Sequence, residues 1–131
     1  GHAMKTVLLV EDESNQRLLY RMELEEDGYQ VLEAADGDQA IAQVSLSHPD
    51  VVVLDLHMPG LDGVATLGKL KELNDRLPVV VYSAYETYKD DFRTWAADAY
   101  VVKSSDPNIL TDTVDQLLGD EPIWPDQMPK N

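Results

Sequence analysis

The segment Val51-Val52-Val53-Leu54-Asp55 is a continuous apolar run, mostly β-branched, that ends in a carboxylic acid. A run without polar alternation is typical of a strand whose two faces are both covered by helices. Similar runs occupy residues 7–10 and 79–82, and weaker ones occupy residues 29–34 and 99–102. The sequence therefore predicts five strands, with the two weaker runs at or near the edges of the sheet.

Segments with helical periodicity separate the five runs. Apolar residues recur three and four positions apart in each of them, which predicts helices over residues 14–26, 37–47, 63–73, 86–96 and 107–118. We expect each apolar stripe to face the core. The stripes consist of Leu18, Leu19 and Met22; Ala40, Ile41 and Val44; Val64, Leu67, Leu70 and Leu73; Tyr88, Phe92 and Trp95; and Leu110, Val114, Leu117 and Leu118.

Residues at the ends of these segments match the chemistry of helix caps. Gly28 and Tyr29 follow the first helix as a left-handed cap and its hydrophobic contact. Asp62 is a candidate N-cap of the third helix, and Asp106 with Pro107 begins the last one. Five alternating strand–helix units with right-handed crossovers form a parallel sheet covered on both faces, so the predicted fold class is α/β.

Length, charge and composition limit the classes of protein. The 131 residues suffice for one domain, which we place at residues 4–119; residues 1–3 resemble an expression scar, and the proline-containing segment 120–131 is a tail or the start of a linker. With 10 Lys and Arg against 25 Asp and Glu, the net charge of −15 speaks against direct nucleic-acid binding. The absence of cysteine excludes disulfides and thiolate chemistry. No apolar run is long enough to cross a membrane, and we expect a cytoplasmic protein.

Polar residues follow four of the predicted strands at the point where each one ends. Glu11 and Asp12 follow the first strand, Asp55 the third, Ser83 the fourth and Lys103 the fifth. In an open α/β sheet, ligands bind beyond the carboxyl ends of the strands, near a reversal of strand order. Taken alone, each residue is most often a cap, a turn residue or a surface charge. Together they predict that three carboxylates, one hydroxyl and one ammonium group meet at one edge of the sheet.

The carboxylates in this set indicate a metal ion. Three like charges a few Å apart repel one another and raise each other's pKa values, so a fold tolerates them when a cation joins them. Oxygen ligands suit Mg²⁺, which keeps several water molecules that a substrate phosphate can replace, and Mn²⁺ can substitute for it. Calcium would need a denser run of ligands, and zinc would need His or Cys donors, of which only His57 is near.

With the charge neutralised, Asp55 can attack a phosphoryl group and become an acyl phosphate. Phosphoryl transfer requires charge compensation on the equatorial oxygens more than it requires acid–base catalysis. Lys103, the hydroxyl group of Ser83 and neighbouring backbone N–H groups can supply that compensation. The residues thus predict a Mg²⁺-dependent phosphoryl site.

Four motifs give the chain a resemblance to the CheY-like receiver domain of two-component response regulators, from Lys5 to about Leu118. They are Val10-Glu11-Asp12, the segment Leu54-Asp55-Leu56-His57-Met58-Pro59-Gly60-Leu61-Asp62-Gly63, Tyr82-Ser83-Ala84 and Ala99-Tyr100-Val101-Val102-Lys103. The resemblance implies a flavodoxin-like, doubly wound fold with five parallel strands in the order 2-1-3-4-5 and five helices. It also implies a signalling phosphoprotein of a phosphorelay. Such a domain is not an enzyme in the usual sense, because it catalyses only its own phosphorylation and slow self-dephosphorylation.

The same resemblance implies how the phosphoryl group and the metal ion are bound. Asp55 would accept the phosphoryl group from the phosphohistidine of a sensor histidine kinase or phosphotransfer protein. Asp12, Asp55 and the backbone carbonyl of His57 would ligate Mg²⁺, and Glu11 would act through a bound water molecule.

It further implies a switch. Ser83, Lys103 and the backbone N–H of Ala84 would hold the phosphoryl oxygens. Phosphorylation adds negative charge and three acceptors at one point. Ser83 would then move toward the phosphate, and Tyr100 would turn into the vacated space. The signal would reach a protein partner, through the face formed by the fourth helix, the fifth strand and the fifth helix, as a shift between existing states.

The bond after Lys103 and the side chains of His57 and Tyr85 lead to two further expectations. Family members commonly have proline after the lysine, often with a cis bond, whereas Lys103 is followed by Ser104. A non-proline cis bond costs about 2.5–4 kcal/mol, so we expect a trans bond here. His57 and Tyr85 flank the path that a hydrolytic water molecule would take, and their bulk leads to the hypothesis of slow loss of the phosphoryl group.

Three other functions share part of this pattern. A haloacid-dehalogenase-like phosphohydrolase also uses a strand-end Asp and Mg²⁺, but it requires a second Asp two positions later, where His57 stands. A flavodoxin-like cofactor protein needs a phosphate loop rich in Ser, Thr and Gly, whereas Glu11, Asp12 and Glu13 would repel a phosphate. A degenerate receiver that serves only as a scaffold would lack part of the site, which is complete in this sequence.

Overall fold

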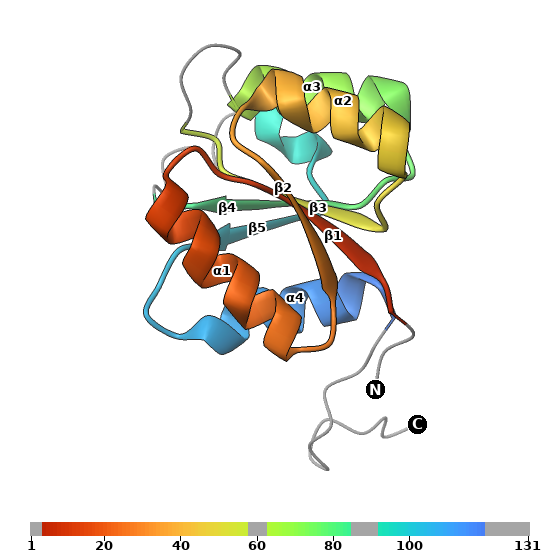
Figure 1. The fold of residues 1–131 in the computed structure, drawn as a ribbon. Coiled ribbons are helices and arrows are strands. Elements are labelled where there is room, and N and C mark those ends of the chain that lie inside the picture. The colour runs from red at the N-terminus through yellow and green to blue at the C-terminus, as the bar shows by residue number, and fades with distance from the viewer. Residues whose placement is uncertain (1–3, 58–62, 85–91, 120–131) are drawn as a thin grey trace, which may run out of the picture.

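The structure is a computed structural model of the 131-residue chain and describes residues 4–57, 63–84 and 92–119. One sheet of five parallel strands lies at its centre, in the order β2-β1-β3-β4-β5 (Figure 1). The strands are β1 (Thr6–Val10), β2 (Gln30–Ala34), β3 (Val51–Leu54), β4 (Val79–Ser83) and β5 (Ala99–Val102). The predicted strand order is confirmed, with β2 and β5, formed by the two weaker runs, at the edges.

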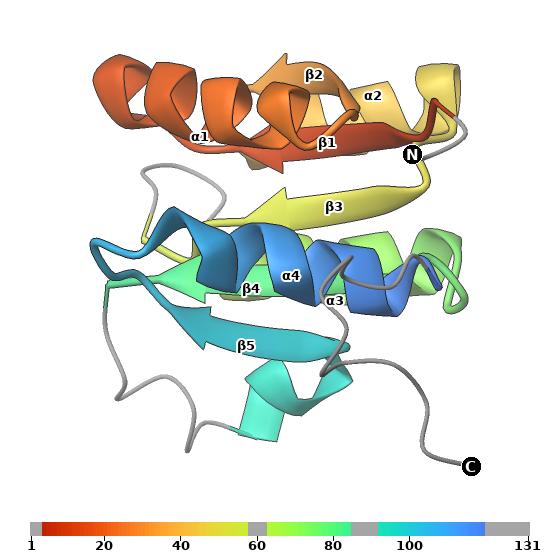
Figure 2. The same ribbon diagram turned by 90° about the horizontal axis from the view of Figure 1, so that it is seen from below.

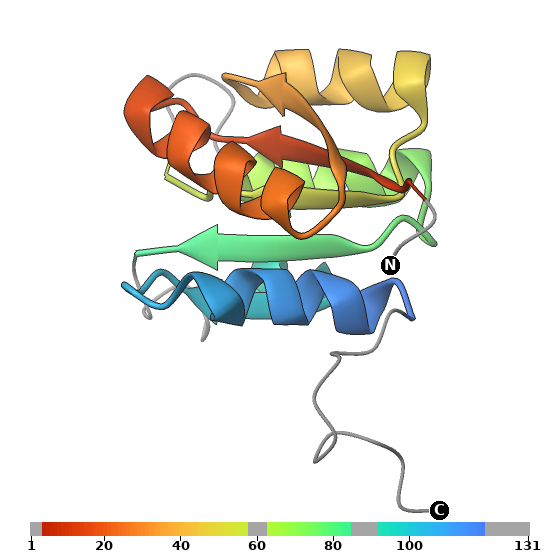
Figure 3. The same ribbon diagram turned by 60° about the horizontal axis from the view of Figure 1, so that its bottom comes forward.

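Helices cover both faces of this sheet. Figures 1 and 3 show α1 (Ser14–Glu26) and α4 (Pro107–Leu117) on one face, with α2 (Gly37–Ser47) and α3 (Gly63–Leu73) on the other. A short 3₁₀ helix, η2 (Phe92–Ala96), lies on the same side as α3. No helix in the part of the chain that the structure describes is long and apolar enough to span a membrane.

Alternation along the central strands divides the hydrophobic core into two. Leu8 and Val52 pack with the residues of α2 and α3, whereas Val7 and Val51 pack with those of α1 and α4. All four side chains are fully buried. A continuous apolar run is required in β1 and β3 because each face of the strand lies in a core of its own.

The predicted caps of the first and last helices are confirmed. Gly28 has a positive φ of 98°, and the N–H of Tyr29 donates to the carbonyl of Leu24 at 3.2 Å, which closes α1. The Asp106 carboxylate accepts a hydrogen bond from the N–H of Asn108 at 3.0 Å, and Pro107 is the first residue of α4. The predicted cap at Asp62 lies outside the described residues, as do the segments 1–3 and 120–131.

The prediction of an α-helix over 86–96 is wrong in its described part, which is the 3₁₀ helix η2. Three residues per turn place positions 94 and 97 on one side. Thr94 is therefore buried and Ala97 packs against the core, while Trp95 is 71% exposed rather than part of a core stripe. Residues 86–91, including Tyr88, and the side chain of Phe92 lie outside the description.

The apolar stripe predicted for α1 does not face the core. Leu18, Leu19 and Met22 are each more than half exposed, at 56%, 52% and 57%, and Tyr20 and Leu24 are buried in their place. Leu73, predicted to be the last residue of the apolar stripe of α3, is 53% exposed and does not face the core either.

Polar contacts with β2 accompany the observed orientation of α1. Arg17 Nε lies 2.9 Å from a carboxylate oxygen of Glu33, and Arg21 pairs with the other oxygen of the same group. Arg17 also donates to the backbone carbonyl of Glu11 at 2.8 Å. In this orientation the two arginines meet β2, and positions 20 and 24 face the sheet.

This orientation predicts different costs for the same substitution at two leucines of α1. Leu24→Ala should lower the free energy of unfolding by about 2–5 kcal/mol, because it leaves a cavity in the core. Leu18→Ala should change it by less than about 0.5 kcal/mol, because that side chain is in solvent. Urea unfolding of both variants measures the difference, and equal losses would show that α1 is rotated from the orientation described.

Candidate functional site

The carboxyl ends of the strands bring the predicted residues together. Figure 2 shows β1, β3, β4 and β5 all pointing to the same edge of the sheet. Backbone hydrogen bonds continue past the strand ends, from Asp55 N to Val10 O at 3.0 Å and from Lys103 N to Ser83 O at 2.7 Å. The sheet therefore fixes the positions of the residues that follow its strands, including Glu11, whose N–H donates to Ala34 O at 3.0 Å.

The three predicted acids form one cluster. Glu11, Asp12 and Asp55 each offer a carboxylate oxygen, and these oxygens lie within 4.8 Å of one another. Glu11 and Asp55 are buried, with 2% and 8% of their surface exposed, whereas Asp12 is open to solvent. Burial raises the pKa of Glu11 above its ordinary value, and the charge of Asp55 adds to this shift against the opposing effect of Lys103. Such a cluster of oxygen donors suits a divalent cation.

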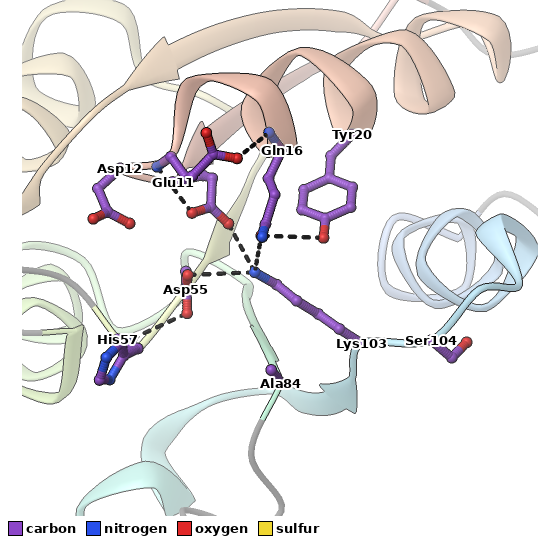
Figure 4. A pocket seen from close by; sticks show the side chains of 10 residues that line it. Glu11, Asp12, Gln16, Tyr20, Asp55, His57, Ala84, Lys103 and Ser104 are labelled. Carbon is purple, nitrogen blue, oxygen red and sulfur yellow. Dashed lines mark hydrogen bonds and ion pairs between the residues drawn. The ribbon is translucent and has the colours of Figure 1, made fainter.

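The ammonium group of Lys103 connects this cluster to α1. Its Nζ donates to Glu11 Oε1 at 2.8 Å, to Gln16 Oε1 at 2.9 Å and to Asp55 Oδ2 at 3.3 Å (Figure 4). Burial acts to lower the pKa of Lys103, but the hydrogen bond to Glu11 and the charges of Asp55 and Glu11 raise it above its ordinary value. Lys103 therefore remains a cation and offsets part of the repulsion between the carboxylates.

The acids and the lysine line one open cavity of about 510 Å³ (Figure 4). Its described lining consists of Glu11, Asp12, Glu13, Gln16, Tyr20, Asp55, His57, Ala84, Lys103 and Ser104. The cavity is open, with Asp12 exposed to solvent and Asp55 buried in its lining.

Four residues of this lining were not predicted as site residues, namely Glu13, Gln16, Tyr20 and Ser104. Gln16, which is exposed, and Tyr20, which is buried, lie four positions apart on the side of α1 that faces the cavity. The spacing of Gln16, Tyr20 and Leu24 carries the signal, since residues four apart share one face of a helix. The signal was missed because the more apolar residues of α1 drew the prediction to the wrong face.

The structure also describes Ser83, His57 and Tyr100, three further residues predicted to belong to the site or to its switch. Ser83 ends β4 and is fully buried, and the described lining of the cavity contains its neighbour Ala84 but not Ser83 itself. His57 lies at the rim of the cavity, and its N–H donates to Asp55 Oδ1 at 3.0 Å. Tyr100 lies on β5, partly buried against the core. Tyr85 lies outside the described residues, so its proposed effect on hydrolysis stays a prediction.

The expected trans bond after Lys103 is confirmed, since no peptide bond among the described residues is cis. Ser104 follows Lys103 at the edge of the cavity and leads into the loop before α4.

Close packing of α3 against the segment after β3 supports Asp55 from behind. A Cβ atom at Gly63 would lie 2.2 Å from the Cα of Leu56 and 2.6 Å from the carbonyl oxygen of Asp55. The N–H of Gly63 also donates to the carbonyl of Leu56 at 3.1 Å. No side chain fits at this position without moving the backbone that carries Asp55, which explains the glycine that follows Asp62 in the sequence motif.

Comparison with known proteins identifies the family of this arrangement. The family model described as the response regulator receiver domain matches residues 7–115. The chain belongs to this family. The chain is 36% identical over 116 residues to a probable transcriptional regulator, ycf27, of Cyanophora paradoxa. That match covers 87% of this chain and 48% of the regulator, so the chain spans about half the length of this curated relative.

Solved receiver structures agree with the fold. The response regulator TrrA from Thermotoga maritima, in complex with Mg²⁺ and BeF, superposes with a TM-score of 0.86 and 37% identity, over 88% of this chain and 100% of that chain. A second structure, of the histidine kinase ThkA in complex with TrrA, superposes with a TM-score of 0.83 and 37% identity, over 88% of this chain and 99% of that chain.

Two glycines of α3 provide a matched test of the support behind Asp55. Gly63→Ala should destabilise the protein, because the new Cβ must displace the backbone of Leu56 and the carbonyl of Asp55. Gly68→Ala should be neutral or stabilising by up to about 1 kcal/mol, because nothing lies within 4 Å of its Cβ position and alanine favours the helix. Thermal unfolding of both variants measures the effect. A Gly63→Ala protein as stable as Gly68→Ala would contradict the close approach.

Proposed function

We propose that Asp55 is the phosphoacceptor of this receiver domain and that it takes its phosphoryl group from the phosphohistidine of a sensor histidine kinase or phosphotransfer protein. The observation that carries the proposal is the contact of one ammonium group, Lys103 Nζ, with both Glu11 and Asp55 at the floor of an open acidic cavity. Membership of the receiver family and the complex between ThkA and TrrA support the choice of donor.

The oxygen ligands at this site fit Mg²⁺. Asp12 and Asp55 would ligate it directly, together with the backbone carbonyl of His57, and Glu11 would act through a water molecule. The Mg²⁺ and BeF in the TrrA structure support this ion, with Mn²⁺ as a substitute. When bound, the ion supplies positive charge next to the phosphoryl oxygens. The buried position of Glu11 and Asp55 makes such a charge favourable, because two neighbouring carboxylates are otherwise left with one ammonium group.

The transfer is a substitution at phosphorus. A carboxylate oxygen of Asp55 forms the new bond to phosphorus while the bond from phosphorus to the donor nitrogen breaks, and the nitrogen keeps the electron pair. Lys103, the hydroxyl group of Ser83 and the N–H of Ala84 stabilise the charge on the transferred oxygens. Lys103 Nζ already lies 3.3 Å from Asp55 Oδ2, so only a small movement brings it to an oxygen bound to phosphorus.

The buried position of Ser83 suggests how phosphorylation would change the face that binds a downstream protein. Its hydroxyl group has to turn toward the cavity to reach the phosphoryl group, which disturbs the end of β4. Tyr100 lies on the neighbouring strand β5, paired through Val81, and its partly buried ring would move into the space released. We propose that the changed face, formed by η2, β5 and α4, then binds a downstream protein.

The protein that supplies the phosphoryl group also needs a surface on which to dock. Leu18, Leu19 and Met22 on α1 are exposed, and α1 begins two residues after Asp12. An apolar surface beside an acidic cavity can hold a helical partner while its phosphohistidine reaches Asp55, so these three residues support a protein donor.

Acetyl phosphate tests the proposed phosphoacceptor without knowledge of the kinase. In the presence of Mg²⁺, the wild-type protein should gain the mass of one phosphoryl group, measured on the intact protein. Asp55→Asn should not gain it, because the amide oxygen is a poor nucleophile. Asp50→Asn is a suitable control, because Asp50 precedes β3 at the opposite edge of the sheet. Equal labelling of wild type and Asp55→Asn, or labelling unaffected by EDTA, would refute the proposal.

A further inference from the structure

Two tyrosine rings stand behind the ammonium group of Lys103. Tyr20 on α1 and Tyr82 on β4 are both buried, and their ring centroids are 5.0 Å apart at an interplanar angle of 73°. Lys103 Nζ lies 5.2 Å from the centre of the Tyr20 ring and 5.7 Å from that of Tyr82. The phosphoryl chemistry proposed for Asp55 assigns no task to either ring.

We propose that Tyr20, supported by Tyr82, is a positioning residue that holds the Lys103 ammonium group at the carboxylates, ready for the phosphoryl oxygens. This inference rests on the proposed function. An aromatic face attracts a cation, and the attraction grows when water is excluded. The Lys103 side chain is only 13% exposed, so its ammonium group meets these rings out of solvent.

The flexibility of a lysine side chain explains why its ammonium group needs a positioning residue. A lysine side chain has a flexible four-carbon stem and loses much conformational freedom when its end is fixed. Lys103 must be fixed near Asp55 before the phosphoryl group arrives, because every reorganisation during the transfer adds to the barrier. Two ring faces on one side and two carboxylates on the other restrict the ammonium group to one small region.

A short hydrogen-bonded chain extends this arrangement. The Tyr20 hydroxyl group donates to Gln16 Oε1 at 3.4 Å, and Lys103 Nζ donates to the same oxygen at 2.9 Å (Figure 4). Since an ammonium group can only donate, the oxygen of the Gln16 amide must face it. The Tyr20 hydroxyl group favours the same amide orientation. Its long contact makes it the weaker contribution of Tyr20, so the ring carries most of the effect.

Tyr20 is also a core residue, packed with Leu24 and Val53 in the same cluster. A substitution can therefore act through stability alone, and the test has to separate the two effects. Lys103 is proposed to contact the phosphoryl group and not the metal ion. Loss of its positioning should weaken binding of a phosphoryl mimic without weakening the binding of Mg²⁺ alone, because the ammonium group then opposes the ion less, whereas a general loss of structure would weaken both.

The experiment is a titration of Mg²⁺ alone and of beryllofluoride in the presence of Mg²⁺, followed by calorimetry at a temperature where every variant is folded. Tyr20→Leu should raise the Kd of beryllofluoride about tenfold, as expected for the loss of a cation–π contact, and should not raise that of Mg²⁺. Tyr20→Phe keeps the ring and should stay within about threefold of wild type. Tyr29→Leu, at another buried tyrosine of the same core, should leave both constants unchanged.

A double-mutant cycle with Lys103→Met completes the test. Tyr20→Leu should have no further effect on beryllofluoride binding once Lys103 is replaced, because its action passes through that ammonium group. An undiminished effect in the Lys103→Met background, equal losses for Mg²⁺ and beryllofluoride, or an unchanged Kd in Tyr20→Leu would each overturn the inference. A wild-type protein that binds no beryllofluoride would instead overturn the proposed function, so the two failures are distinguishable.

Discussion

The contact of the Lys103 ammonium group with the carboxylates of Glu11 and Asp55 is the interaction on which the rest of the site depends. Two buried carboxylates and a third exposed one stand within 4.8 Å of one another, and one ammonium group offsets only part of their charge. The remaining negative charge suits a divalent cation. In the proposed function, the same ammonium group would contact the phosphoryl oxygens once Asp55 carried an acyl phosphate.

Backbone contacts fix the positions of these charged residues, in addition to the side-chain contacts of Lys103. Hydrogen bonds that continue the parallel ladder fix Glu11, Asp55 and Lys103 one residue beyond their strands. Gly63 lets α3 approach the backbone of Asp55 and Leu56. Two separate cores secure the central strands on both faces, so the stability of the sheet can offset the electrostatic cost of the site. A functional site that is locally unfavourable is thereby carried by the rest of the domain.

Much of this arrangement could be predicted from the sequence, because it depends on rules of short range. Continuous apolar runs identify β1, β3 and β4, and parallel strands necessarily bring Asp12, Asp55 and Lys103 to one edge. Tyr20 and Gln16 could not be found in the same way. The orientation of α1, in which Arg17 and Arg21 pair with Glu33 on β2, depends on contacts between elements that are distant in the sequence. The 3₁₀ helix η2 packs beside α3, whereas periodicity alone favoured an α-helix there.

The stability of the protein with and without Mg²⁺ tests the central claim most directly, namely that the three acids form one receptor for the ion. The free energy of unfolding should be measured for wild type and Asp12→Asn, first in EDTA and then in millimolar Mg²⁺. Wild type should be stabilised by the ion, because only the folded protein holds the three carboxylates together. Asp12→Asn should be at least as stable as wild type in EDTA, since one repelling charge is gone, and should gain much less from Mg²⁺. The same gain in both proteins would contradict the account.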